Sequence, residues 1–385
     1  MRLGLEPAVI SIVGDDEQEL ERALAEGLRA DLCVVTGGLG PTHDDRTVEL
    51  VGRAAGVPLR VDDGLHAEIE GISRAIAERL HRPYADFEKG VVKQATLPEG
   101  AASLGLAGTA PGLVLQAGTA AVVILPGPPR ELQRLWPRAL ETEPVRRVLE
   151  RTRPPEHRVM RFFGASESEV ARALAEAGGE PQGVVATICA RDFEIHVDLY
   201  GPAGDLAETF RARLGRHLFS EEERGIEEIV LELCRGRGWT LATAESCTGG
   251  MVAERLTSVP GSSHAFVGGI VAYSNGVKER ELGVPVETLE RHGAVSPETA
   301  AAMAAGAREW LGADVAVSVT GVAGPGGGSP EKPVGLVYIH ALTPEAARGI
   351  EFTYGQDRES IRRRATVSSL HLLRRLLAQS RDEAA

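Results

Sequence analysis

The sequence predicts an α/β protein made of two three-layer α/β domains joined by a small α+β domain. Short apolar runs that are typical of buried strands alternate with amphipathic helical segments in the first and last parts of the chain. Between them, residues 193–201 alternate apolar and polar side chains, as a half-exposed antiparallel strand does. The length of 385 residues is in keeping with two or three domains.

Residues 1–150 form the first predicted domain. We expect a parallel sheet covered on both faces, because buried-strand runs alternate with helical spacing. The opening residues are typical of the end of a helix, so the domain is expected to lack its first strand and helix. Residues 143–158, with many charges and paired prolines, are expected to be a linker. The predicted elements are strands at 8–13, 30–38 and 119–127 and helices at 16–28 and 46–56.

Residues 155–222 form the small α+β unit. Ser166 or Ser168 is the natural N-cap of its first helix. The unit shows no cluster of reactive groups along the sequence, so we expect it to be a spacer or a docking module. The predicted elements are strands at 158–164, 183–191 and 193–201 and helices at 166–177 and 205–218.

Residues 225–385 form the third unit. Ser296 as N-cap, Pro297 at the first helical position and Gly312 beyond the end mark one of its helices clearly. A long helix is expected over 357–379. The other predicted elements are a helix at 225–238 and strands at 239–246, 266–274, 314–321, 335–342 and 349–355.

Composition narrows the classes of function. With 42 basic and 55 acidic residues the net charge is −13, which argues against direct nucleic-acid binding through phosphates. The four cysteines have no metal-ligand or redox spacing, which fits a reducing cytoplasm. No apolar run approaches the ~20 residues of a membrane helix, so no membrane partner is expected. We expect a cytoplasmic homo-oligomer that binds small-molecule nucleotides.

The stretch 240–256 places a polar cluster on a strand-to-helix turn. Ser246, Cys247 and Thr248 follow a buried strand, and Gly249 and Gly250 allow a ligand to approach the backbone. Backbone N–H groups at a helix start can stabilise an oxyanion or a phosphate. From this stretch alone an ordinary helix N-cap is the simpler interpretation.

Further polar residues follow other strands, and they favour a binding or catalytic site over an ordinary helix N-cap. Tyr273 and Lys278 come after a second strand, Thr320 ends a third, and Arg358 and Arg362 lie one turn apart at the start of the last helix. Ligands of open α/β sheets bind outside the carboxyl ends of strands, so a hydroxyl nucleophile and a phosphate-bearing substrate are indicated. The alternatives are a surface lysine, a solvated basic helix face and an ordinary flexible glycine loop.

These segments resemble the C-terminal domain of the CinA family, whose members include nicotinamide-nucleotide amidases. The similarity is carried by TAESCTGG, YSNGVK, GAVSPETA, VTGVAGPGGGSPEKPVG and DRESIRRRAT. It implies hydrolysis of nicotinamide mononucleotide to nicotinate mononucleotide and ammonia, with Ser246 as nucleophile, Lys278 as proton acceptor and no organic cofactor. The implied substrate-binding residues are Glu245, Thr248, Gly249, Gly250, Tyr273, Thr320, Gly321, Gly324, Arg358 and Arg362.

The chemistry of these side chains is consistent with that assignment. Lysine can act as a base only if its pKa falls from about 10.4 to about 7–8. Burial and the neighbouring arginines would lower it. Cys247 is a rival nucleophile, although a packed thiol is the simpler interpretation. Glu245 could orient Lys278, bond to backbone, or be solvated.

A glycine turn after the predicted strand at 30–38 marks a second candidate site. Paired Asp44 and Asp45 could hold Mg²⁺, while a loop that ends in an aspartate N-cap is the alternative. With the loops at 108–113 and 124–132, this region resembles the molybdopterin-binding-like N-terminal domain of CinA proteins, associated with metal-dependent ADP-ribose pyrophosphatase activity. The sequence has Val91 where that family usually has asparagine. The candidate nucleotide-binding residues are Gly37, Gly38, Gly40, Thr42, Asp44 and Gly127.

The resemblance extends to the middle unit, whose RFFGASESEV resembles the KH-like connector of the same proteins. Amide hydrolysis by the third unit is the function that the sequence favours. One alternative is that the ADP-ribose pyrophosphatase of the first domain is the main activity. The other is a non-catalytic partner protein in competence or DNA repair.

Overall fold

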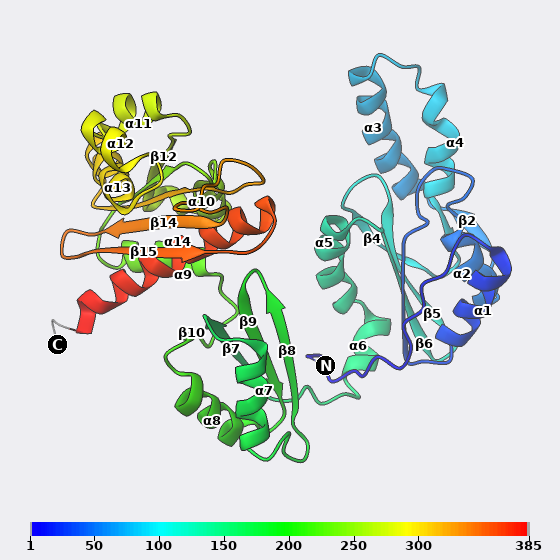
Figure 1. Ribbon diagram of the computed structural model, residues 1–385. Helices are drawn as coiled ribbons and strands as arrows, with labels where there is room; N and C mark the ends of the chain where they lie inside the picture. Colours follow the sequence, from blue (N-terminus) through cyan, green and yellow to red (C-terminus); the bar gives the residue numbers. More distant parts are fainter. Residues whose placement is uncertain (1, 383–385) are drawn as a thin grey trace. The chain divides into compact units, whose positions relative to one another are not determined.

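The computed structural model describes residues 2–382, with side chains up to Gln379. The chain divides into two compact units, residues 1–155 and 156–385. The first is a single α/β unit, and the second contains both the connector sheet and the C-terminal sheet (Figure 1).

The first unit is built on a four-stranded sheet in the order β1-β6-β5-β4. Its central strand β6 is fully buried, and apolar side chains fill both faces of the sheet. A separate two-stranded ribbon, β2-β3, lies beside helices α2 and α4 (Figure 1). The strands are β1 (Leu32–Thr36), β2 (Leu59–Val61), β3 (Thr96–Pro98), β4 (Ala102–Leu106), β5 (Pro111–Ala117) and β6 (Ala120–Leu125). The helices are α1 (Glu17–Gly27), α2 (Thr47–Ala55), α3 (Asp63–Arg79), α4 (Ala85–Gln94), α5 (Pro129–Leu140) and α6 (Glu143–Leu149).

Two predictions for this unit are wrong. Only β1 and β6 are parallel, because the chain from β4 to β6 runs through tight antiparallel connections that the sequence did not reveal. Residues 8–13 are not a strand: no neighbouring strand pairs with them, and Ile10 and Ile12 are 84% and 98% exposed. Without backbone partners an apolar segment cannot enter a sheet, however favourable its composition.

The expected linker at 143–158 is also shorter than predicted. Residues 143–149 form α6, whose Val145 and Val148 are buried against the sheet of the first unit. The arginines that suggested a linker lie on the exposed side of this helix. Only the segment after α6, with Pro154 and Pro155, connects the two units.

The connector, residues 156–222, is an antiparallel sheet in the order β10-β7-β9-β8 with two helices packed on it. The first helix begins with a capping box in which Ser166 and Glu169 bond to each other's backbone, as the N-cap prediction for Ser166 required. Buried Phe162 and Phe210 fill its core. Its elements are β7 (His157–Phe163), α7 (Glu167–Glu176), β8 (Val185–Arg191), β9 (Glu194–Tyr200), α8 (Gly204–Leu214) and β10 (Leu218–Ser220).

The C-terminal part is a three-layer sandwich around a five-stranded sheet in the order β12-β11-β13-β14-β15. Helices α9, α10 and α14 pack on one face, and α11 and α13 on the other (Figure 1). The strands are β11 (Leu241–Glu245), β12 (Phe266–Val271), β13 (Val315–Gly321), β14 (Leu336–Leu342) and β15 (Ala347–Thr353). The helices are α9 (Ile226–Arg235), α10 (Met251–Thr257), α11 (Asn275–Leu282), α12 (Val286–His292), α13 (Pro297–Trp310) and α14 (Arg358–Asp382).

The topology of this sheet brings four strand ends to one edge. Strands β12, β11 and β13 are mutually parallel. Strand β14 is antiparallel to β13, and β15 is antiparallel to β14, so β15 again runs with the first three. The carboxyl ends of β11, β12, β13 and β15 therefore lie at the same edge, where the sequence places its polar side chains.

None of the helices among residues 2–382 has the length and apolar character needed to cross a lipid bilayer.

Candidate active site

A buried serine–lysine pair lies at the carboxyl edge of the C-terminal sheet. Ser246 directly follows β11, and its N–H donates to the carbonyl of Val319 on β13 at 2.9 Å, which fixes the turn. Lys278 comes from the second turn of α11, which is capped by Ser274. The Nζ of Lys278 lies 3.0 Å from the Oγ of Ser246, and the two residues are 1% and 8% exposed. The structure thus brings together two side chains that are 32 positions apart.

Two backbone carbonyls also lie within reach of the Nζ of Lys278. Its Nζ donates to the carbonyl of Ala272 at 2.7 Å, and the carbonyl of Tyr273 lies at 3.5 Å. A neutral amine has two hydrogens and one lone pair, so in that state the two carbonyls can accept the hydrogens while the lone pair faces the hydroxyl of Ser246. The hydroxyl can then donate to the amine, which is the geometry that proton abstraction requires.

Electrostatics favour the same state of Lys278. Burial lowers the pKa of its amine, and the neighbouring Cys247 acts in the opposite direction. Burial also raises the pKa of the Cys247 thiol to about 12, so that thiol is neutral at physiological pH and supplies no counter-charge. The same shift makes Cys247 a poor nucleophile, because the thiolate is the reactive form.

Glu245 is a structural residue of the turn. One of its carboxylate oxygens accepts N–H bonds from Gly250 at 2.9 Å and Val252 at 3.1 Å, and the other accepts from Ala253 at 2.8 Å. It caps the start of α10, where a negative charge is favourable. Of the three roles considered for Glu245, the structure selects backbone bonding over orienting Lys278. With 1% exposure it does not reach the cavity, contrary to its predicted substrate-binding role.

The position of this helix also revises the prediction for the oxyanion. Helix α10 begins at Met251, five residues after Ser246, and its first amides are occupied by Glu245. Gly249 and Gly250 have φ of 63° and 102° and make the left-handed turn that separates serine from helix. Thr248 is fully buried, and neither it nor the two glycines line the cavity. These three residues shape the turn that carries Ser246, and their predicted role in substrate binding stays a prediction.

A cavity of about 280 Å³ opens in front of Ser246 and Lys278. Five of the predicted substrate-binding residues line it, namely Tyr273, Thr320, Gly321, Gly324 and Arg358. Sequence reasoning missed the rest of the lining, which is Ala294, Val295, Val322, Ala323, Gly326 and Gly327, and it considered Cys247 only as a rival nucleophile. The motif GAVSPETA, which holds Ala294 and Val295, was the available signal.

Arg358 provides the positive charge of the cavity. Its Nη1 donates to the carbonyl of Gly324 at 2.6 Å, and its Nη2 donates to the hydroxyl of Tyr273 at 3.2 Å. It therefore joins the glycine-rich loop after β13 to the loop after β12 at the solvent side of the cavity. Thr320, at the end of β13, donates to the carbonyl of Ala294 at 2.6 Å and fixes the apolar wall.

Arg362, one helical turn further along α14, has a different role from Arg358. Its Nε donates to the carbonyl of Cys247 at 3.0 Å, and its Nη2 donates to the carbonyl of Thr248 at 2.9 Å. The planar guanidinium thus holds two successive carbonyls of the turn that carries Ser246. Arg362 does not line the cavity, so the structure separates the two arginines that the sequence grouped together.

The second candidate site, in the first unit, is a backbone turn after β1. Gly37 and Gly38 have φ of 92° and 66°, and the N–H of Gly37 donates to the carbonyl of Leu125 at 3.0 Å. Gly127, after the adjacent strand β6, packs close to the Cα of Gly37. The two loops predicted to form a nucleotide site therefore lie side by side, with Gly40 two positions further along the first of them.

The two carboxylates of this loop, those of Asp44 and Asp45, differ in their hydrogen bonds and their exposure. Asp45 accepts from the N–H and the hydroxyl of Thr42 at 3.0 and 2.6 Å and so closes the turn. Asp44 is exposed, and its hydrogen bond with Thr42 lowers its pKa. In the described part of the chain no third histidine, cysteine or acidic ligand joins this pair. Mg²⁺ can be held by one or two carboxylates together with water, so it does not require a third protein ligand. The metal site at Asp44 and Asp45 therefore stays a prediction.

The fold and the two sites define a class of protein: an α/β chain with a molybdopterin-binding type of domain at its start and a serine–lysine pair in a second α/β domain at its end. Comparisons give the same division, since residues 1–144 match the model of a probable molybdopterin binding domain and residues 223–377 that of the CinA C-terminal domain. The chain belongs to the CinA family.

Relatives cover nearly all of the sequence. A CinA-like protein of Mycobacterium tuberculosis is 42% identical over 398 aligned positions, which span 98% of this chain and 91% of the relative. A CinA-like protein of Mycobacterium avium is 41% identical over 99% of this chain and 92% of the relative. Among solved structures, the competence/damage inducible protein CihA from Agrobacterium tumefaciens is 42% identical and covers 40% of this chain and 97% of its own, with a TM-score of 0.38.

Proposed function

We propose that the C-terminal cavity hydrolyses the carboxamide of nicotinamide mononucleotide to nicotinate mononucleotide and ammonia. The observation that carries this proposal is the 3.0 Å contact between the Nζ of Lys278 and the Oγ of Ser246, both buried at the base of one cavity. A serine hydroxyl attacks an amide only when a neighbouring base removes its proton. Near Ser246 that base is an amine whose pKa is lowered by burial.

The reaction divides into two halves. The Oγ of Ser246 bonds to the carboxamide carbon while its proton passes to the Nζ of Lys278. The tetrahedral intermediate then breaks its C–N bond, and Lys278 returns the proton to the leaving nitrogen, so ammonia departs and an ester with Ser246 remains. Water then attacks the ester carbon and gives a proton to Lys278. Cleavage of the ester releases the nicotinate product and restores the Ser246 hydroxyl with that proton.

The cavity offers suitable surroundings for the rest of this substrate. Ala294, Val295 and Val322 give an apolar wall for a flat pyridinium ring. Arg358, at the solvent side, is the candidate for the nucleotide phosphate. The backbone N–H of Cys247, beside the nucleophile, is our candidate donor to the oxyanion, for which one donor is typically worth about 2.7–4 kcal/mol.

Ammonia release from nicotinamide mononucleotide by the full chain and by Ser246→Ala tests the proposal. We expect turnover by the wild type and a fall of at least a thousandfold in the variant. Equal release by both proteins would reject Ser246 as the nucleophile. Because Ser246 is buried and small, circular dichroism of the variant should match that of the wild type, which separates lost chemistry from lost folding.

An ADP-ribose pyrophosphatase in the first unit remains the second candidate. The side-by-side loops of Gly37 and Gly127 and the exposed carboxylate of Asp44 favour it. Turnover of ADP-ribose with Mg²⁺, compared between wild type and Asp44→Asn, tests it separately from the amidase. No turnover of either substrate would favour the third candidate, a non-catalytic partner protein in competence or DNA repair.

A further inference from the structure

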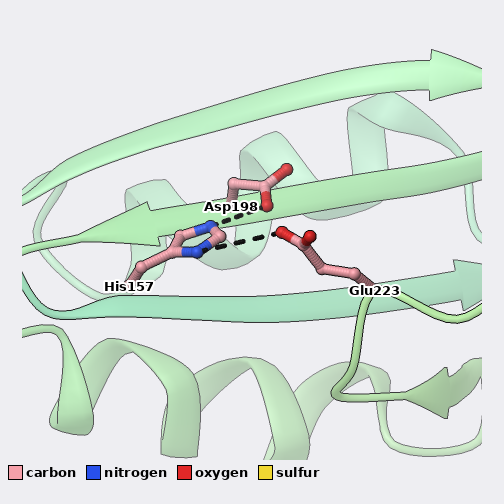
Figure 2. A group of neighbouring side chains, drawn as sticks. All are labelled: His157, Asp198 and Glu223. Carbon is pink, nitrogen blue, oxygen red and sulfur yellow. Dashed lines mark hydrogen bonds and ion pairs between the residues drawn. The ribbon is translucent and has the colours of Figure 1, made fainter. Parts of the chain in front are cut away.

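The connector carries a cluster of potential metal ligands that sequence reasoning did not detect. His157 lies at the start of β7, Asp198 on the adjacent strand β9, and Glu223 on the segment that leads from β10 to α9. Figure 2 shows that each nitrogen of the imidazole faces a different carboxylate, Nε2 that of Asp198 and Nδ1 that of Glu223. One ligand atom from each residue lies within 4.8 Å of the other two, and this is the one such group of three found among the residues that the structure describes.

The spacing of these atoms fits coordination. The Nε2 of His157 lies 2.9 Å from an Oδ of Asp198. Two ligands bound to Zn²⁺ at about 2.0–2.2 Å each stand roughly 3 to 3.5 Å apart, so a cation could enter this pair with small side-chain shifts. The carboxylate of Glu223 lies 3.9 Å from the other ring nitrogen, Nδ1, and is 49% exposed, so binding of one ion by all three residues requires this side chain to move toward Nε2.

The surrounding structure holds the first two ligands in place. The ring of Tyr200 stacks on the imidazole of His157, with centroids 4.7 Å apart and planes at 11°, which fixes the directions of both nitrogens. Asp198 is held by the buried guanidinium of Arg161, which also donates to the carbonyl of Val197 at 3.0 Å. Orientation of metal ligands by such outer partners is typical of real sites.

Arg161 is also the main electrostatic argument against a cation here. Its contacts with the Asp198 carboxylate are 3.3 and 3.5 Å long. These exceed the about 2.7–2.9 Å of strong charged hydrogen bonds. A carboxylate has about four lone-pair directions and so can serve a guanidinium and a metal together. Glu221 and Glu222 line the same cavity as Glu223, but they form ion pairs with Arg211 and Arg224.

The ligand type and the space available narrow the choice of ion. One imidazole with two carboxylates suits zinc and similar transition metals, whereas Mg²⁺ and Ca²⁺ prefer oxygen ligands alone. A cavity of about 430 Å³, lined among others by His157, Glu222 and Glu223, lies next to the cluster. It leaves room for the water that would fill a fourth position.

We propose that His157, Asp198 and Glu223 bind one divalent cation of the zinc type. The ion would join segment 221–223 to strands β7 and β9, and so fasten the start of the C-terminal part to the connector. This inference is independent of the proposed amidase activity, because none of the three residues belongs to the cavity of Ser246.

Zinc binding by the full chain tests the proposal. Protein stripped with a chelator is titrated with Zn²⁺ against a chromophoric competitor, and bound metal is counted by elemental analysis. His157→Phe keeps an aromatic ring against Tyr200 but has no nitrogen, and Glu223→Gln removes one charge. Glu222→Gln is the matched control, since it removes the neighbouring charge from the wall of the same cavity.

The wild type should bind one more zinc ion per chain than His157→Phe, and Glu223→Gln should bind that ion at least tenfold more weakly. Glu222→Gln should remain within about twofold of the wild type. Zinc should raise the melting temperature of the wild type and of Glu222→Gln but not that of His157→Phe. If His157→Phe takes up zinc as the wild type does, or if neither binds any, the cluster is only a hydrogen-bonded bridge and the proposal is wrong.

Discussion

The imidazole of His371 in α14 stacks on the ring of Phe163 in the connector strand β7, with centroids 3.8 Å apart and planes at 5°. Its Nε2 lies 2.7 Å from the carboxylate of Glu194 on β9, and Phe219 packs against its edge. Helix α14 begins with Arg358 and Arg362 at the candidate active site, so one helix contacts both the cavity and the connector. The connector therefore packs against the same helix that contacts the turn of Ser246.

This contact predicts a loss of stability in mild acid. Burial lowers the pKa of His371 from its usual 6.5 to about 4, against the opposing effect of Glu194 and with a contribution from Arg374 and Arg375. Between these pH values the unfolded chain binds a proton that the folded chain does not, so the free energy of unfolding falls as pH decreases from 6.5 to 4. At about 1.36 kcal/mol per unit, the loss is about 3 kcal/mol. Urea denaturation at several pH values measures it.

A non-titrating replacement isolates the contribution of this histidine. In His371→Gln the amide can still donate to Glu194, and we expect a shallower fall of stability over the same pH range than in the wild type. His264→Gln, which replaces an exposed imidazole in the same part of the chain, should follow the wild type. An unchanged slope in His371→Gln would show that other groups cause the acid sensitivity.

The pH dependence of turnover should report the amine of Lys278. Because burial lowers its pKa below 10.5, kcat/KM should rise with pH as the ammonium loses its proton and level off at a pH below 10.5. Initial rates of ammonia release in buffers of constant ionic strength give this profile. Lys278→Arg places a permanently charged group at the same position, so activity should fall by about 10²–10⁴-fold at every pH. A variant that retains the activity and profile of the wild type would exclude Lys278 as the base.

The same amine should affect stability in alkaline solution. A lowered pKa in the folded state means that the unfolded chain binds more protons at pH values between the folded pKa and 10.5. The free energy of unfolding of the wild type should therefore rise with pH relative to that of Lys278→Met, by up to about 1.4 kcal/mol per pH unit. Parallel urea titrations of both proteins from pH 7 to pH 10 measure the difference. A constant difference would mean that Lys278 titrates as a free lysine.

Much of the C-terminal site was predictable because its residues follow a simple rule of topology. Ser246, Lys278, Thr320 and Arg358 each come at or soon after the end of a strand, and parallel strands bring their carboxyl ends together. The family motifs supplied the pairing of Ser246 with Lys278. Backbone bonding by Glu245 was one of three roles left open, because the choice depends on the backbone path through two left-handed glycines.

Other features depend on register and could not be read from the chain. His157 and Asp198 face each other only because β7 and β9 pair antiparallel with Val159 opposite Asp198. A shift of one residue would turn the carboxylate to the other face of the sheet. In the first unit, the hairpin of β5 and β6 was missed because its turn at 118–119 interrupts a continuous apolar region with only one glycine and one threonine.

The role of Arg362 gives a prediction that distinguishes positioning from substrate binding. The sequence grouped Arg362 with Arg358 as substrate-binding residues, whereas the structure directs Arg362 to the carbonyls of Cys247 and Thr248. Lysine cannot bond to both carbonyls with the same planar geometry, so in Arg362→Lys the turn that holds Ser246 should loosen and kcat should fall about 10–100-fold with KM nearly unchanged. Arg363→Lys, an exposed neighbour that pairs with Asp192, is the control and should keep the wild-type kcat. Steady-state kinetics with nicotinamide mononucleotide distinguish the two roles, because replacing an arginine that binds the substrate phosphate would raise KM instead.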